Sequence, residues 1–325
     1  MKQLVTTRQT IIIGIVCGLL VLTAFLAGCT SSTPATPVAT TVAGVTSVPA
    51  TPAPAAQATP QVVSTTAVPV AVATTGTPAP VYTYSEGNVV AYTAASLKGA
   101  SPALAAGFEK MYPGHHVVFN LDGTQVLRTQ VQNGAYADVF ISASQKYTTE
   151  LTSGGYFVDG SVKPLTSNYV IVILPAKNPG NINSLADLSK PGLKIAMGDI
   201  TVPVGTATYG ALANLAKSTY GNDWNTSVFK NVVTYETAEP NVAAKVALGE
   251  VDAGFVYEST ATAAPKDTYI AITIPKKDNY LQTYQIGVMK QSTSKGAAAD
   301  FANFMLSTSG QQILKDYGFR PITSS

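Results

Sequence analysis

Cysteine, histidine, tryptophan and charge are all scarce in this sequence of 325 residues. Both cysteines, Cys17 and Cys29, lie near the N-terminus, so the rest of the chain forms no disulfide and has no thiol chemistry. Only 12% of the residues are charged and the net charge is +2, which argues against nucleic-acid binding, because that requires a basic face. The two histidines, His115 and His116, are expected on the surface, and no nucleophile–base arrangement accompanies them. We therefore expect neither an enzyme nor a cofactor.

The first 29 residues have the pattern of a secretion signal. Lys2 and Arg8 give a positive start, residues 11–26 form an apolar run, and small residues precede Cys29. This is typical of a lipobox, whose cysteine is lipidated after cleavage. The alternative is an uncleaved membrane helix, because the run is close to the ~20 residues that a span requires. Either anchor places the rest of the chain on the extracellular face of the cytoplasmic membrane.

Residues 30–87 consist mainly of Thr, Pro, Ala, Ser and Val, with almost no charge and no helical period. Such a composition cannot bury a core. We interpret this stretch as a linker that holds the remaining part of the protein away from the membrane.

From residue 88 strands and helices alternate. Strands are expected at residues 89–92, 116–119 and 138–143, with helices at residues 102–111 and after Thr124. This βαβαβ order indicates a parallel sheet with right-handed crossovers. Ligands bind beyond the carboxyl ends of such strands.

A second unit repeats this order, and the last strands and helices return to the first. Expected strands lie at residues 169–174, 194–197, 232–235, 253–257, 270–274 and 284–289, and expected helices at 206–217, 241–248, 297–306 and 311–317. The predicted fold is therefore α/β with two lobes, each a mostly parallel sheet flanked by helices. Residues 88–167 and 283–325 form lobe I, and residues 168–282 form lobe II. The two crossings form a hinge, with a ligand cleft between the lobes.

Ser96 lies where the first strand turns into a helical pattern. One interpretation is a plain helix N-cap. The other is an anion site, because a helix N-terminus presents free N–H groups and partial positive charge, to which Ser96 adds a hydroxyl. Repetition of such strand–turn–helix junctions along the chain favours the anion site.

Five segments occur in an order that resembles a known family. They are Thr93-Ala94-Ala95-Ser96-Leu97, the run from Gly134 to Ala143, Gly198-Asp199 with Val202-Pro203-Val204-Gly205, the run from Gly249 to Tyr257, and Gly310-Gln311-Gln312-Ile313-Leu314 with Tyr317-Gly318-Phe319. Together they resemble the molybdate-binding proteins of ABC transporters, which have the type II periplasmic-type binding fold. The resemblance extends from residue 88 to about residue 321.

The resemblance implies a monomeric receptor that closes on molybdate or tungstate and delivers it to a membrane permease. It also implies that two hydroxyl side chains, two main-chain N–H groups and a tyrosine hydroxyl hold the oxyanion. By motif, the hydroxyls fall on Ser96 and Thr124, the main-chain donors on Val204 and about Glu239, and the tyrosine is Tyr257.

Two positions depart from the family pattern. Asp122 lies in a turn that is usually rich in Ser and Gly, and Glu239 precedes Pro240, which has no N–H. The last donor could instead come from Asn241 or Val242. A related archaeal branch binds the metal octahedrally through carboxylates, a role that Glu239 or Asp122 could take.

The identity of the anion is left open by the residues themselves. A site built only from donors suits fully deprotonated oxyanions such as molybdate, tungstate or sulfate. Monohydrogen phosphate needs an acceptor, and Asp122, Asp199 and Glu239 lie near the junctions. The alternatives are therefore a receptor for sulfate or phosphate, or a surface module that kept the fold and lost transport.

Overall fold

The structure is a computed structural model that describes residues 87–321. The predicted secretion signal, Cys29 and the linker up to residue 86 lie outside this range. None of the helices within it is long and apolar enough to cross a membrane.

Ten strands and nine α-helices are found between residues 87 and 321. The strands are β1 (Asn88–Ala94), β2 (His116–Asp122), β3 (Val139–Ser142), β4 (Lys163–Pro175), β5 (Ile195–Gly198), β6 (Val232–Glu236), β7 (Ala253–Tyr257), β8 (Tyr269–Thr273), β9 (Leu281–Val288) and β10 (Arg320–Pro321). The helices are α1 (Ser101–Met111), α2 (Thr124–Gln132), α3 (Gln145–Ser153), α4 (Pro203–Leu215), α5 (Asn222–Lys230), α6 (Glu239–Ala247), α7 (Glu258–Ala263), α8 (Lys295–Leu306) and α9 (Thr308–Asp316). Three short helices complete the set: Ala95–Leu97, Leu185–Ser189 and Ala216–Tyr220.

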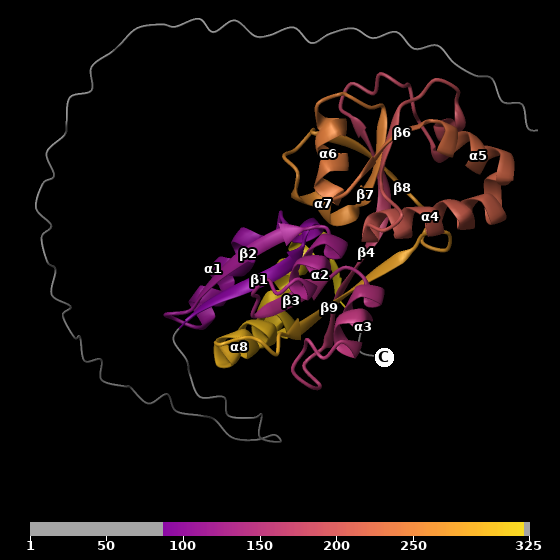
Figure 1. Ribbon diagram of the computed structural model, residues 1–325. Helices are drawn as coiled ribbons and strands as arrows, with labels where there is room; N and C mark the ends of the chain where they lie inside the picture. Colours follow the sequence, from indigo (N-terminus) through magenta and orange to yellow (C-terminus); the bar gives the residue numbers. More distant parts are fainter. Residues whose placement is uncertain (1–86, 322–325) are drawn as a thin grey trace, which may run out of the picture. The chain divides into compact units, whose positions relative to one another are not determined.

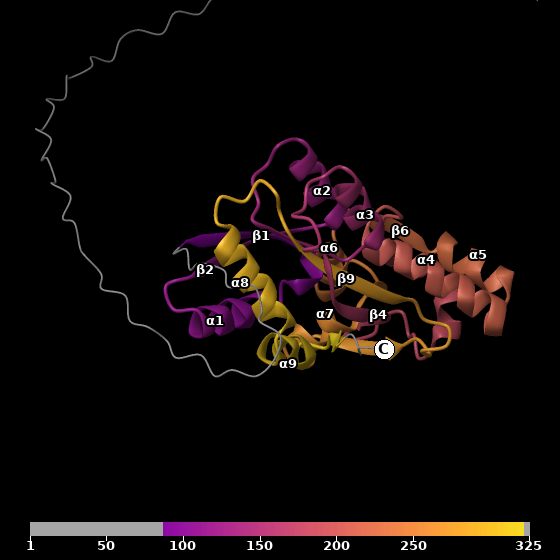
Figure 2. The ribbon, with the colours of Figure 1, turned by 90° about the horizontal axis from the view of Figure 1, so that it is seen from below.

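The first lobe is a sheet in the order β2-β1-β3-β9-β4, with β10 paired to β4 (Figure 1). β1 is parallel to β2 and β3, whereas β9 runs antiparallel to β3 and β4. Helices α1, α8 and α9 cover one face and α2 and α3 the other, as Figure 2 shows. Alternating side chains of β1 enter the two cores, because Val89 and Ala91 face α1 while Tyr92 faces α2.

The second lobe is a sheet in the order β4-β7-β5-β6, with β8 on the other side of β4. β5 is parallel to β6 and β7, and β4 is antiparallel to β7 and β8. Helix α4 packs on one face against Val172 and Phe255, and α6 packs on the other against Ile173 and Val256. Both sheets are thus buried between helices, and the predicted two-lobed α/β fold class is confirmed. The expectation that each sheet is mostly parallel was wrong, because β4, β8, β9 and β10 pair antiparallel with their neighbours.

β4 is shared by the two lobes. It pairs with β9 as far as Tyr169 and with β7 from Val170 onwards. The chain returns to the first lobe just before Leu281, whose Cα partner is Tyr169. Two neighbouring strands therefore carry the chain between the lobes.

Two local expectations were wrong. Helix α4 begins at Pro203 rather than at residue 206, because a proline suits the first helical turn, where its missing N–H costs nothing. His115 is fully buried rather than on the surface, with its ring 5.9 Å from the Phe108 ring. The backbone N–H of His115 donates to the Tyr112 carbonyl, and this turn directs the ring onto α1. His116 is exposed, as expected.

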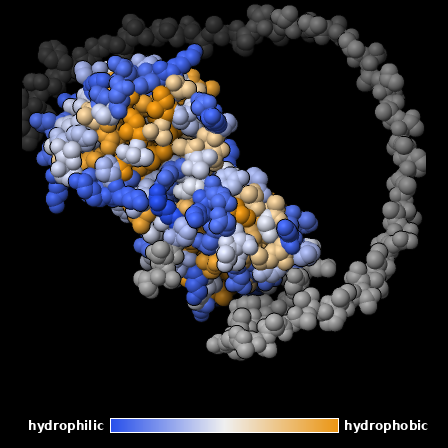
Figure 3. All heavy atoms as spheres, turned by 180° about the vertical axis from the view of Figure 1, so that it is seen from behind, coloured by the Kyte–Doolittle hydropathy of each residue, from blue (hydrophilic) through white to orange (hydrophobic). Residues whose placement is uncertain are grey.

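Some apolar side chains are exposed on the surface. In the view of Figure 3 they gather over part of one lobe among hydrophilic neighbours. Val233 and Tyr235 on the edge strand β6, and Leu248 after α6, are among the exposed large apolar side chains. Because exposed apolar residues are ordinary on protein surfaces, we assign no function to them.

Candidate functional site

A small cavity lies where segments of both lobes meet. The volume open to the centre of a water molecule is about 10 Å³. This is about the volume that one water molecule requires, and it is far below the roughly 300–1,000 Å³ of pockets that take organic ligands. The cavity is lined by Ala94, Ala95, Ser96, Gly123, Thr124, Ala143, Val202, Pro203, Val204, Glu239 and Tyr257. The structure therefore brings together all five residues that the sequence nominated: Ser96, Thr124, Val204, Glu239 and Tyr257.

Ser96 follows the carboxyl end of β1, within the short helix Ala95–Leu97. It is not the N-cap of α1, because the chain makes this extra turn first and α1 begins only at Ser101, after Ala100. Its hydroxyl lies 2.8 Å from the hydroxyl of Tyr284, a fully buried residue of β9. Sequence analysis placed Tyr284 on a strand but gave no signal for this contact, since the two residues are 188 positions apart.

Thr124 is the first residue of α2 and is 1% exposed. Its Oγ1 accepts a hydrogen bond from the Ala143 N–H at 3.2 Å. The hydroxyl hydrogen of Thr124 is thus left to donate elsewhere. The first N–H groups of a helix have no acceptor within the helix, and those of α2 begin at this residue.

Val204 lies in the first turn of α4, directly after Pro203. The turn before it is held by Asp199, whose Oδ1 accepts from the N–H and hydroxyl of Thr201 at 2.9 and 2.7 Å. Gly205 is required here, because a Cβ at this position would overlap with the carbonyl oxygen of Asp199. Since Pro203 has no N–H, the Val204 N–H is the first main-chain donor that α4 offers.

Glu239 is the first residue of α6 and is 3% exposed. The Asn241 N–H already donates to the Ala238 carbonyl at 3.1 Å, and Pro240 has no N–H. The remaining main-chain donor of this turn is therefore that of Glu239, not that of Asn241. The Glu239 side chain is also buried: its Oε1 accepts from the Tyr257 N–H at 3.1 Å and from the Thr260 hydroxyl at 2.6 Å.

Tyr257 ends β7 and is 1% exposed. Its hydroxyl has no hydrogen-bond partner among the described residues, although buried hydroxyls are normally paired. Burial raises the pKa of the Tyr257 phenol well above its ordinary value, so the hydroxyl keeps its proton. It is thus a buried donor in the cavity wall with nothing to donate to.

The electrostatic character of the cavity comes from helix ends. Among residues 87–321, neither Lys nor Arg lines it, but α2, α4 and α6 each begin at its wall with their partially positive N-termini. Asp122 and Asp199 do not line it either; the Oδ1 of Asp122 accepts from the Gly123 N–H at 2.7 Å. Both aspartates stabilise turns, and the arrangement suits a small anion held by neutral donors.

Two side chains connect the lobes beside the cavity. Gln125 Nε2 donates to the Thr237 carbonyl at 2.7 Å, and the Tyr147 hydroxyl donates to the Thr201 carbonyl at 2.5 Å. These contacts join α2 and α3 of the first lobe to loops of the second. In this structure the two lobes are therefore in contact beside the cavity.

No group of three or more His, Cys, Asp or Glu side chains within residues 87–321 is arranged to hold a metal ion.

Together, the two-lobed fold and the small cavity of hydroxyls and helix N-termini define a solute-binding protein of the periplasmic type.

Comparison with known proteins identifies the family. Residues 89–320 match the model of the family described as bacterial extracellular solute-binding protein, and the chain belongs to this family. The molybdate-binding protein ModA of Mycobacterium tuberculosis is 31% identical over 233 residues, which cover 71% of this chain and 84% of that protein. These findings confirm the predicted resemblance.

Solved structures support the fold. The periplasmic molybdate-binding protein of Azotobacter vinelandii is 24% identical, with a TM-score of 0.61, and the match covers 71% of this chain and 98% of that one. The sulfate-binding protein SubI of M. tuberculosis is 18% identical, with a TM-score of 0.64, and the match covers 73% and 88%. Because proteins named for different oxyanions share it, the fold alone does not select the anion.

Proposed function

We propose that this protein is the extracytoplasmic receptor of an ABC transporter, and that it binds molybdate or tungstate between its lobes. The observation that carries the proposal is that Ser96, Thr124, Val204, Glu239 and Tyr257 all line one small cavity. The similarity to proteins named for molybdate binding supports this choice of anion. Receptors of this kind release their ligand unchanged to a permease, so the proposal contains no catalytic step.

The proposed ligand contacts use the hydroxyl and main-chain donors of the residues that line the cavity. For Ser96 this requires that the Tyr284 hydroxyl is the donor in the bond between the two side chains. Ser96, Thr124 and Tyr257 supply hydroxyl hydrogens, and Val204 and Glu239 supply main-chain N–H groups. A desolvated dianion needs several donors at once, and a wall without Lys or Arg can supply them from neutral groups.

The proposed organisation has lobe I at residues 88–167 and 283–325 and lobe II at residues 168–282. The change in the pairing of β4 between Tyr169 and Val170 supports a boundary near that point. We further propose that the protein acts as a monomer, and that lipid on Cys29 anchors it to the outer face of the membrane. The apolar run and small residues before Cys29 support the anchor.

The test is a thermal-shift and calorimetric comparison of molybdate, tungstate, sulfate and phosphate, using the full-length protein in detergent. A ligand that binds the folded state raises the melting temperature. The proposal expects large shifts with molybdate and tungstate alone. A larger shift with sulfate or phosphate would reassign the receptor to that anion, and no shift with any of them would favour a surface module that has left transport.

Site variants test the contacts. Ser96→Ala and Tyr257→Phe should each weaken molybdate binding by roughly 1–3 kcal/mol, as expected when a charged group loses a donor. Ser218→Ala, at an exposed residue of the second lobe, is the control and should leave affinity unchanged. Unchanged affinity in both site variants would refute the assignment of the site.

A further inference from the structure

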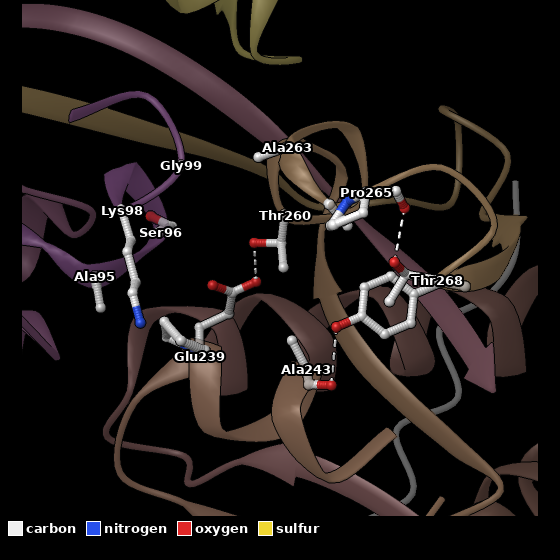
Figure 4. A pocket seen from close by; sticks show the side chains of 13 residues that line it. Ala95, Ser96, Lys98, Gly99, Glu239, Ala243, Thr260, Ala263, Pro265 and Thr268 are labelled. Atoms are coloured by element: carbon white, nitrogen blue, oxygen red, sulfur yellow. Dashed lines mark hydrogen bonds between the residues drawn. The ribbon is translucent and has the colours of Figure 1, made fainter. Parts of the chain in front are cut away.

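Of the described residues that line the cavity, Glu239 alone has an acidic side chain, and the two oxygen atoms of its carboxyl group differ in their contacts. Oε1 accepts two hydrogen bonds, from the Tyr257 N–H and the Thr260 hydroxyl. Oε2 is buried and has no partner among the described residues. Figure 4 shows Oε1 joined to Thr260, while Oε2 points to the side on which Ser96 lies.

No cation compensates this carboxyl group. Within residues 87–321, no Lys, Arg or His nitrogen lies within 4.0 Å of its oxygens. Lys98 lines the neighbouring pocket of about 400 Å³ but is exposed and makes no ion pair with Glu239 (Figure 4). A buried carboxylate without a counter-charge is costly. Burial accordingly raises the pKa of Glu239 to about 7, against the smaller opposing effects of the hydrogen bonds from Thr260 and Tyr257.

The neutral acid fits this environment better than the carboxylate. In the neutral form, Oε1 remains the acceptor of both existing hydrogen bonds, and the proton resides on Oε2. Oε2–H is then a donor on the side of the carboxyl group on which Ser96 lies, and Ser96 and Tyr257 line the same cavity as Glu239. A dianion at this place would be repelled by the ionised form and would accept a hydrogen bond from the neutral one.

We infer that the side chain of Glu239 is a proton-carrying donor to the bound oxyanion, so that binding of a fully deprotonated dianion takes up one proton from solvent. This inference rests on the proposed function and deepens it. Glu239 then contributes its side chain as well as its main-chain N–H. Its role is to select anions that need only donors against monohydrogen anions, whose own O–H needs an acceptor.

The other titratable groups around Glu239 do not provide this proton. Tyr257 and Tyr284 face it from β7 and β9, Tyr269 from β8, and Lys98 from the turn after β1. Burial raises the pKa of all three tyrosines, so they remain neutral at physiological pH. Among the three tyrosines and Glu239, the carboxyl group is the one expected to titrate near neutrality.

The experiment is calorimetric titration of the full-length protein in detergent with sodium molybdate from pH 6 to pH 8.5. Each pH is measured in two buffers of different ionisation enthalpy, which gives the number of protons taken up. We expect about no uptake at pH 6, about half a proton at pH 7 and nearly one at pH 8.5. The association constant should be flat near pH 6 and should fall by up to about tenfold per pH unit above pH 7.5.

Glu239→Gln is the informative variant, because glutamine keeps the Oε1 acceptor and replaces Oε2–H with a permanent N–H donor. Its molybdate binding should show no pH dependence between pH 6 and pH 8.5 and no proton uptake. Glu250→Gln, at an exposed glutamate near Lys245, is the matched control and should retain the pH dependence. If the Glu239 variant fails to fold, proton uptake by the unaltered protein still decides the question.

Three results would overturn the inference. The first is molybdate binding without proton uptake in the unaltered protein. The second is an unchanged pH dependence in Glu239→Gln. The third is a preference for phosphate that the variant loses, which would make Glu239 an acceptor from monohydrogen phosphate. In each of these cases the protein still binds an oxyanion, whereas a failure of every anion to bind would remove the proposed function and this inference together.

Discussion

Replacing Glu239 with glutamine is expected to stabilise the ligand-free protein at alkaline pH. The pKa of the Glu239 carboxyl group is raised in the folded protein, so between its unfolded and folded values the native state holds a proton that the unfolded chain has lost. Stability is therefore fully present below the unfolded pKa and is lost as the pH rises through the folded pKa. Glutamine, which does not titrate, removes this loss.

The size of this change in the free energy of unfolding follows from the shift in the pKa of Glu239. The pKa rises from 4.5 to about 7, a difference of roughly 2.5 units, and each unit corresponds to about 1.36 kcal/mol. The unaltered protein should therefore lose about 3 kcal/mol relative to Glu239→Gln between pH 4 and pH 8. Because Glu239 is 3% exposed, solvent screening does not reduce this figure substantially.

The assay is urea unfolding of both proteins without ligand, followed by the fluorescence of Trp224. This is the single tryptophan of the sequence, and it is buried in the second lobe, where Glu239 also lies. Taking the difference between the two proteins at each pH cancels the titration of all other groups. An equal difference for Glu239→Gln at pH 4.5 and pH 8 would refute the reasoning.

Three further changes have defined outcomes. Tyr257→Phe removes a buried hydroxyl that has no partner among residues 87–321. It should therefore stabilise the ligand-free protein by about 1–2 kcal/mol in urea unfolding, while weakening molybdate binding. A lower free energy of unfolding would contradict this. Gly205→Ala should lower the free energy of unfolding by about 1–3 kcal/mol or more, since its Cβ would overlap with the Asp199 carbonyl. A melting temperature equal to that of the unaltered protein would show that the turn can relax. The hydrogen bond from Gln125 to the Thr237 carbonyl joins the lobes. Gln125→Ala should therefore weaken molybdate binding by about 0.5–1.5 kcal/mol, mainly through faster dissociation, which stopped-flow release measures. An unchanged release rate would rule out that role.

Local sequence alone predicted the strand–helix junctions at which the proposed site lies, whereas the roles of the individual residues came from the motif resemblance. Thr124 and Glu239 lie where strands end and helical patterns begin, and Pro203 and Pro240 mark first helical turns. Parallel strands bring such junctions to one edge of each sheet, so their convergence follows from the order of the elements. The motif resemblance then added Val204 and Tyr257, and the structure places both in the wall of the same cavity.

Other features depended on residues far apart in the chain. The contact between Ser96 and Tyr284 spans 188 positions, and no pattern near Ser96 indicates it. The burial of His115 likewise follows from packing against Phe108 rather than from its position before a strand. A plain N-cap was one of the two interpretations of Ser96, but the extra turn at Ala95–Leu97 separates it from α1.

The sequence by itself predicted the alternation of strands and helices and the two-lobed fold class, because periodicity and turn residues are local properties. Through motif resemblance it also nominated five residues that the structure brings to one cavity. The tertiary structure decided how Glu239 is used. Burial of its carboxyl group, the two donors that occupy Oε1, and the lack of a nearby cation among residues 87–321 all depend on which segments pack together. Charge, solvation and hydrogen bonding at one atom are sums over neighbours that lie far apart in the chain, and folding alone brings those neighbours together.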